Sequence, residues 1–190
     1  MFYLSRPGAE TIAAFIAEQQ DHSLTYEHVG CTALERPPTG WNVDHNRILL
    51  GKGDAVLVAA VNAINSWEMF DLGWVSLYPE NAASTEGTVV AALIRHLGFW
   101  SLNASRIVYR IEDRSRQRHY FAYGTLEGHA EMGEERFMID FDTTTGNVYY
   151  DLLAYSRPRH FMAKLGYPFT RMLQKQFAKD SLAVMKRAIA

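Results

Sequence analysis

The sequence predicts an α+β fold in which a curved antiparallel sheet of about seven strands wraps around one long C-terminal helix. Three observations lead to this prediction. After residue 73, short segments of alternating apolar residues follow one another with brief turns, as in an antiparallel sheet. The segment 159–188 instead carries apolar residues at helical spacing. The composition, 48% hydrophobic and 21% charged over 190 residues, is that of a globular protein with a substantial core.

The N-terminal third of the chain predicts two helices and two strands. Pro7 suits the first turn of a helix, and Asp54 is a good N-terminal residue for a second one. The Pro37–Pro38 pair marks a loop between them. In chain order, the expected elements are a helix at 5–20, a short strand at 25–32, a loop at 35–40, a strand at 46–53 and a helix at 54–67.

Six further strands are expected between residues 74 and 156. Pro79 ends the first of them, and TTTGN at 143–147 is a good hairpin turn between the last two. The remaining boundaries fall at glycine or at charged turns. The expected strands are 74–79, 88–97, 100–113, 118–126, 130–142 and 148–156.

The C-terminal segment predicts a short helical lead-in and then a long amphipathic helix that begins near Pro168. We expect its apolar stripe to cover the apolar face of the sheet, and a strongly bent sheet would leave a cavity between the two. The stripe consists of Phe169, Met172, Leu173, Phe177, Val184, Met185 and Ala188.

Several stretches resemble a known family. NVDHNRILLGKG, WEMFDLGWVSLYP, RHLGFWSLNASRIVY, FAYGTLEGHAEMGEERF and DLLAYSRPRHFMAKLGYP are similar to a bacterial and plant domain-of-unknown-function family of the START and pollen-allergen superfamily (SRPBCC). The likeness covers about residues 41–182 and implies the helix-grip fold of that superfamily. It implies a hydrophobic-ligand cavity, since superfamily members bind lipids, sterols and polyketides, and some catalyse cyclisation or hydration. It supplies no catalytic residues.

The chain is expected to form a single domain over residues 1–190, with an N-terminal helix and loop at 1–40 and a helix-grip core at 41–190. Its charge is unevenly distributed, because residues 157–190 hold eight Lys or Arg residues and one acidic residue, Asp180. Such a basic segment is typical of a surface for nucleic acid or an anionic membrane. The apolar stripe favours a different interpretation, a basic helix lying on an acidic body.

Other classes of site find little support. The single cysteine, Cys31, excludes an internal disulfide and multi-cysteine metal sites, and the seven histidines show no ligand spacing. The GKG at 51–53 satisfies neither a P-loop nor a dinucleotide fingerprint, and no Gly-x-Ser-x-Gly elbow is present. We therefore expect no metal, no cofactor, no nucleic acid partner and no membrane-inserted segment. A cytoplasmic location is expected, and the sequence does not set the oligomeric state.

One ionisable residue falls on the core-facing side of a strand. In GEERFMIDFD, residues 133–142, the side chains of Phe137, Ile139 and Phe141 share one face, and Glu135 precedes them on it. A carboxyl group on a core face must take up a proton or find a donor. Glu135 is therefore the residue most indicative of a site.

Polar residues also continue the apolar faces of two other strands. The face of Ile107 and Tyr109 runs back to Asn103, and that of Phe121 carries Tyr123, although the opposite face fits nearly as well. Apolar walls with a few polar groups are typical of a ligand cavity, but the same residues could meet water at an open rim. The candidate ligand-binding residues are Asn103, Tyr109, Tyr123, Glu135, Phe137, Ile139, Phe169, Met172 and Phe177, and no residue is assigned as catalytic.

The function that these observations favour is the binding of a small or medium-sized hydrophobic molecule, lipid-like or polyketide-like, between the sheet and the C-terminal helix, without chemistry. One alternative is a cyclase, hydratase or hydrolase that uses Glu135 as acid or base. Another is a peripheral membrane protein that docks through the basic helix beside Arg171, Lys175 and Lys179. The sequence leaves these alternatives open.

Overall fold

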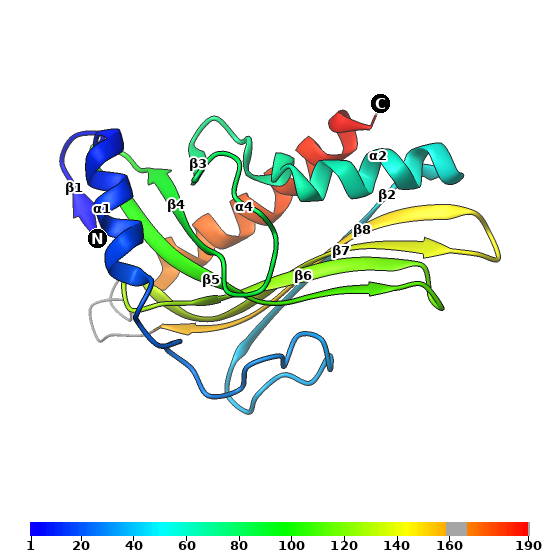
Figure 1. Cartoon of the computed structure of the whole chain (residues 1–190), viewed down its shortest axis with the longest axis horizontal. Coiled ribbons are helices and arrows are strands. Elements are labelled where there is room, and N and C mark those ends of the chain that lie inside the picture. The colour runs from blue at the N-terminus through cyan, green and yellow to red at the C-terminus, as the bar shows by residue number, and fades with distance from the viewer. Residues whose placement is uncertain (159–166, 190) are drawn as a thin grey trace.

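The computed structural model describes residues 1–158 and 167–189 of the chain. Its helices are α1 Ala9–Gln19, α2 Asp54–Asn65 and α4 Tyr167–Ala188, with a short 3₁₀ helix, η1, at Glu68–Phe70 (Figure 1). Its strands are β1 Phe2–Tyr3, β2 Asn42–Lys52, β3 Val75–Tyr78, β4 Val89–Arg95, β5 Trp100–Asp113, β6 Arg118–Thr125, β7 Glu131–Asp142 and β8 Asn147–Pro158.

The strands form one curled antiparallel sheet in the order β2-β8-β7-β6-β5-β4-β3, and β1 adds a short pairing to β5. From β3 to β8, consecutive strands are neighbours, which follows from the short turns between them. Only β2 departs from this order and pairs with β8 at the sheet edge. The predicted sheet of about seven strands is thus confirmed, with β1 as an addition.

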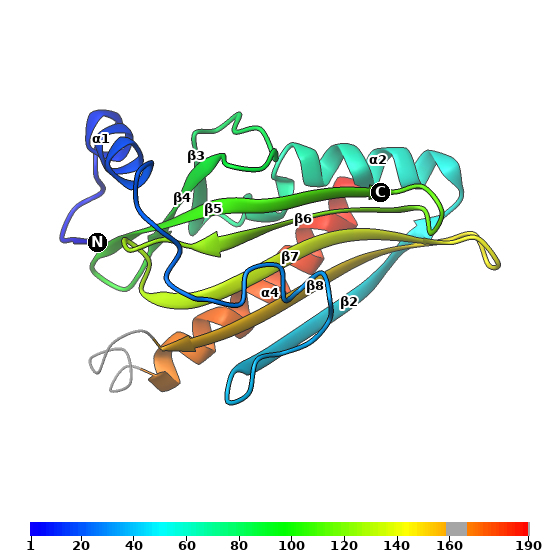
Figure 2. The same cartoon turned by 60° about the horizontal axis from the view of Figure 1, so that its bottom comes forward.

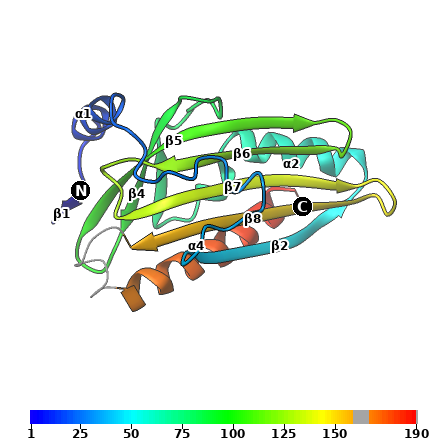
Figure 3. The same ribbon diagram turned by 90° about the horizontal axis from the view of Figure 1, so that it is seen from below.

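The two faces of the sheet bury different sets of side chains. Helices α2 and α4 both lie against the inner face. In the view from below, they lie behind the sheet (Figure 3). On β4, Val90 faces this inner core, while its neighbours Val89 and Ala91 pack against α1 on the outer face. Successive side chains of a strand therefore enter two different hydrophobic cores, because both faces of the sheet are covered.

The segment between α1 and β2 also covers the outer face, where it crosses β7 and β8 (Figure 2). The strand expected at 25–32 is wrong, because these residues form turns. Glu134 on β7 explains the difference, since its carboxylate accepts hydrogen bonds from the backbone N–H groups of Gly30 (2.7 Å) and Thr32 (2.9 Å) and from the hydroxyl of Tyr26 (2.7 Å). The buried Glu134 side chain thus accepts hydrogen bonds from backbone N–H groups that would otherwise have paired with a neighbouring strand.

The long C-terminal helix confirms the predicted element, but only part of its predicted stripe faces the core. Met185 is fully buried, and Phe177 is half-buried with its ring 5.1 Å from that of Phe70. Met172 is 56% exposed, so the expectation that it turns inward is corrected. Phe169 is 40% exposed but lines the space between α4 and the sheet, where its ring lies 6.2 Å from that of His96. The last turns of α4 pack on side chains, whereas the first turns lie over a cavity. The expected helical lead-in at 159–166 lies outside the described residues.

Candidate functional site

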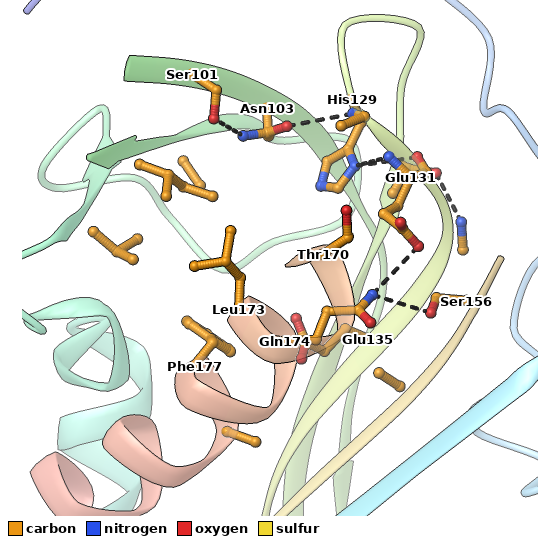
Figure 4. A pocket seen from close by; sticks show the side chains of 18 of the residues that line it. Ser101, Asn103, His129, Glu131, Glu135, Ser156, Thr170, Leu173, Gln174 and Phe177 are labelled. Atoms are coloured by element: carbon orange, nitrogen blue, oxygen red, sulfur yellow. Dashed lines mark hydrogen bonds between the residues drawn. The ribbon is translucent and has the colours of Figure 1, made fainter. Parts of the chain in front are cut away.

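A cavity of about 540 Å³ lies between the inner face of the sheet and the first half of α4 (Figure 4). Its walls are mostly apolar, and its polar side chains come from several strands of the sheet and from α4. The apolar lining residues include Phe70, Trp74, Ile94, Leu152, Leu173 and Phe177. The polar lining residues include Ser101, Asn103, Tyr123, Glu131, Glu135 and Gln174. Predominantly apolar walls with a few placed polar groups are typical of a ligand site.

Strand register brings Tyr123 and Glu135 together. They are direct partners across β6 and β7, so both side chains leave the sheet on its inner face. The Tyr123 hydroxyl donates a hydrogen bond of 2.5 Å to Glu135 Oε2. Burial raises the pKa of the Glu135 carboxyl to about 7, against the opposing effect of this hydrogen bond, and Asp44 adds to the rise. Glu135 can therefore change its protonation near neutral pH.

Replacing Glu135 with glutamine should remove part of the pH dependence of stability. The carboxyl pKa is about 7 in the folded chain against an ordinary 4.5, so the native state binds the extra proton between these values. The stability of the parent therefore falls as pH rises through this window. The variant lacks this loss and should be about 3 kcal/mol more stable than the parent at about pH 8, and about equal in stability to the parent at about pH 4.

Urea unfolding of both proteins at the two pH values measures this difference. The same substitution at exposed Glu86 is the matched control and should leave the pH profile of the parent unchanged. If Glu135→Gln is no more stable than the parent at about pH 8, the carboxyl is not held in a desolvated position.

A second carboxyl group, Glu131, lies on the same face of β7 and is only 6% exposed. Its oxygen Oε2 accepts a long hydrogen bond, 3.3 Å, from Gln174 Nε2, which also donates to Ser156 at 3.3 Å. Arg171 fixes this amide, because its guanidinium donates to Gln174 Oε1 at 2.7 Å and so turns the NH₂ group toward Glu131. Burial raises the pKa of Glu131, while Gln174 and Arg171 oppose the rise.

Gly133 separates the two carboxyl residues on β7. Its φ is 155°, and a Cβ at this position would clash with the backbone oxygen of Tyr155 on β8. Only glycine fits this backbone. The strand can therefore pass close to β8 here while presenting Glu131 and Glu135 on either side.

The polar end of the cavity is completed by β5. The side-chain NH₂ of Asn103 donates to Ser101 Oγ at 3.0 Å, and its Oδ1 accepts from the backbone N–H of Ala130 at 3.3 Å. Ser101 Oγ also lies 2.8 Å from Nε2 of His96, whose ring stacks on Phe99. Burial lowers the pKa of His96, which keeps the imidazole neutral near neutral pH.

A separate polar cluster lies on the outer face of the sheet. Arg136 on β7 and Asp151 on β8 form an ion pair of 2.9 Å, and their side chains are 2% and 1% exposed. Arg136 also donates to the backbone oxygen of Thr32 and to Glu35, both at 3.0 Å. This cluster fastens the segment that precedes β2 to the sheet, and it has a structural role.

Two classes of function receive no support from the described part of the chain. Within residues 1–158 and 167–189, no group of three or more His, Cys, Asp or Glu side chains is arranged to hold a metal ion. Over the same ranges, no helix has the length and apolar character needed to cross a membrane.

Residues 25–184 match the family described as Domain of unknown function (DUF1990). The chain belongs to the DUF1990 family. Its relatives include a UPF0548 protein of Dictyostelium discoideum, 34% identical over all of this chain and 96% of that protein. A UPF0548 protein of Deinococcus radiodurans is 32% identical over 99% of this chain and 98% of that protein. The predicted membership of a domain-of-unknown-function family is confirmed.

Two solved structures are similar to the DUF1990 chain in fold. Ara h 8.0201 has a TM-score of 0.51 at 11% identity and covers 79% of this chain and 98% of its own. The Zhui aromatase/cyclase from a Streptomyces species has a TM-score of 0.50 at 16% identity and covers 78% of this chain and 91% of its own. With the curled sheet and the long C-terminal helix, they confirm the predicted helix-grip fold.

Five of the nine predicted site residues of this DUF1990 chain line the cavity: Asn103, Tyr123, Glu135, Phe169 and Phe177. The structure places the other four elsewhere. Phe137 and Ile139 are fully buried in the inner core beyond the cavity. The ring centroid of Phe137 lies 5.5 Å from that of Phe121. Met172 points outward from α4.

Tyr109 is the fourth, and it lies on the outer face of the sheet. The register between β5 and β6 shifts between Ile107 and Tyr109, and such a bulge transfers the following side chains to the opposite face. Ile107 therefore enters the inner core as predicted, whereas the Tyr109 hydroxyl lies 2.6 Å from Thr32 Oγ1. The alternation of the sequence alone does not reveal this shift.

Glu131, Gln174 and Ser101 are polar lining residues that the predicted set did not include. Glu131 lies two residues before Gly133 on the face that carries Glu135, so extending the alternation would have found it. Gln174 follows Thr170 by one helical turn, and a polar pair inside an apolar stripe is a usable signal. Ser101 precedes Asn103 on the same face of β5.

Proposed function

We propose that this protein binds a small or medium-sized hydrophobic molecule, lipid-like or polyketide-like, in the cavity between the sheet and α4. The observation that carries the proposal is a volume of about 540 Å³ with mostly apolar walls in a protein whose other inner-face side chains pack closely. Ligand sites are clefts or cavities of roughly 300–1,000 Å³ with mostly apolar walls and a few placed polar groups, and this cavity falls in that range. A bound hydrophobic molecule would remove its apolar walls from contact with water.

The groups at the cavity support binding with a defined orientation. The ring of Phe177, whose centroid is 5.1 Å from that of Phe70, lies at one end, and the hydrogen-bonding groups of Ser101 and Asn103 lie at the other (Figure 4). An elongated molecule with an apolar body and a polar group would satisfy both. In the peripheral-membrane alternative, Arg171 was one of the basic side chains expected beside the membrane. Its guanidinium instead forms a bidentate ion pair with Asp44.

Filling the cavity tests the proposal. The neutral apolar dye Nile red should bind the parent saturably, with a rise in fluorescence. Ala92→Phe, which places a ring on the cavity wall, should weaken this binding at least about tenfold. Ala83→Phe, at an exposed position, is the matched control and should bind as the parent does.

A second filling variant guards against misfolding. Ala154 lines the cavity from β8, so Ala154→Phe should reproduce the effect of Ala92→Phe, with thermal unfolding checking that each variant is folded. Equal dye affinity in the parent and in both folded filling variants would contradict the proposal.

The enzyme alternative has one observation in its favour. Glu135 has a carboxyl pKa of about 7, faces the cavity and receives a hydrogen bond from Tyr123, as a general acid or base at neutral pH requires. A cyclase, hydratase or hydrolase would change the chemical structure of the bound molecule. Mass spectrometry of a ligand before and after incubation with the protein distinguishes catalysis from binding.

A further inference from the structure

Two carboxyl groups of the cavity have few hydrogen-bond donors among the described residues. The carboxyl groups of Glu131 and Glu135 both reach it, and the described residues give each of them one hydrogen bond, on Oε2. Both donors are neutral, a Gln174 amide and a Tyr123 hydroxyl. Each carboxyl group therefore keeps an oxygen, Oε1, without a donor from the described part of the chain. A buried carboxylate in this state is stabilised by a ligand that donates.

The charge of the described lining is also one-sided. It includes Asp44, Glu131 and Glu135, but no Lys or Arg side chain among residues 1–158 and 167–189. The guanidinium of Arg171, whose charge acts on Glu131, is engaged by both carboxylate oxygens of Asp44 and by Gln174. A carboxylate or phosphate ligand would meet like charge here, whereas a cation would meet opposite charge.

Aromatic rings surround the region of Glu135. Phe70 lies 5.1 Å from Phe177 and 6.3 Å from Tyr123, measured between ring centroids, and all three rings line the cavity. Trp74 lines it as well. The faces of aromatic rings attract organic cations, and a desolvated site strengthens that attraction. This feature is independent of the carboxyl groups and favours the same kind of ligand.

We propose that the ligand of this cavity is an organic amine, whose protonated nitrogen binds Glu135 among the aromatic rings and whose apolar body fills the remaining volume. The inference rests on the proposed function and gives its ligand a chemical class. Glu131 lies four residues away on the same strand, roughly 13 Å along β7, too far for one ammonium to contact both carboxyl groups closely. With Gln174 and Ser156, it suits a hydroxyl or second amine at the far end of the ligand.

Three probes of nearly the same shape test the amine class. 4-Phenylbutylamine, 4-phenylbutanol and 4-phenylbutyrate share one apolar body and end in a cation, a neutral group and an anion. Titration calorimetry at about pH 8, where the amine is protonated and Glu135 is ionised, should show the amine binding at least about tenfold more tightly than the alcohol. The carboxylate should bind most weakly.

Glu135→Gln identifies the residue responsible. In this variant the amine should lose about tenfold in affinity, while the alcohol, which also reports that the cavity is intact, should bind within about twofold of the parent. Glu86→Gln, at an exposed position, should leave all three affinities unchanged.

The outcomes separate this inference from the proposed function. If the alcohol binds as tightly as the amine, or the carboxylate binds best, the amine class is wrong and the hydrophobic cavity stands. An amine preference that survives Glu135→Gln likewise overturns the assignment. If none of the three probes binds the parent and Nile red also fails to bind, both the inference and the proposed function are wrong.

Discussion

Replacing Asp151 with alanine is expected to lower the free energy of unfolding by about 3–5 kcal/mol. The substitution removes the partner of a guanidinium that is 2% exposed, at a 2.9 Å ion pair. Burial lowers the pKa of Arg136, whereas the hydrogen bond and charge of Asp151, with smaller contributions from Glu35 and Tyr109, raise it. The net shift of the pKa is upward, so the guanidinium stays charged. Without Asp151, this charge is left with Glu35, whose side chain is 57% exposed.

The loss should extend to the neighbouring residues on β2. Asp151 Oδ2 lies 2.8 Å from His45 Nε2 and 3.5 Å from Arg47, so both side chains lose this contact, while Arg47 keeps its 2.6 Å ion pair with Asp140. Urea unfolding measures the change, and Asp21→Ala, at an exposed position, should stay within about 0.5 kcal/mol of the parent. A loss below about 1 kcal/mol for Asp151→Ala would mean that water reaches the pair.

Met185→Ala should destabilise the protein by about 2–5 kcal/mol. Met185 is fully buried where the last turns of α4 pack on the inner core, so the truncation leaves a cavity that its neighbours fill only in part. The result would establish α4 as a structural wall of the core.

Met172 provides a matched control on the same helix. It is 56% exposed, so Met172→Ala changes the same atoms and the same helix propensity with little loss of buried surface. Its free energy of unfolding should stay within about 0.5 kcal/mol of the parent. Equal losses at the two positions would contradict the orientation of α4.

Periodicity was sufficient to predict most of the fold. The alternation in each of the six strands after residue 73 and the helical spacing near the C-terminus are local signals, and the structure contains the corresponding elements. The short turns then determined most of the strand order, because neighbours in sequence became neighbours in the sheet. The placement of β2 beside β8 and of β1 beside β5 required long-range pairings that no local pattern encodes.

The errors have identifiable physical causes. One register shift after Ile107 moved Tyr109 to the outer face, and backbone irregularities of this kind leave no periodic trace. The segment 25–32 has strand-like composition, but the buried carboxylate of Glu134 holds it in turns. In this second case a tertiary contact outweighed a local preference.

Glu135 could be predicted as a site residue from the sequence, whereas the role of Gln174 could not. Glu135 stood out because a carboxyl group breaks an apolar face, and the structure places it in the cavity with Tyr123 opposite. Gln174 depends instead on the angle at which α4 crosses the sheet. Its role is set by Arg171, which reaches Asp44 on β2. Such a contact between distant elements follows from packing rather than from local pattern.

Native mass spectrometry of the purified protein tests the central claim, that the cavity is a ligand site, most directly. The parent should carry one additional small-molecule mass that is released on denaturation, and the folded Ala92→Phe variant, with its cavity filled, should lack it. Detection of the bare polypeptide alone for the parent, or of the same bound mass on the filled variant, would contradict the account.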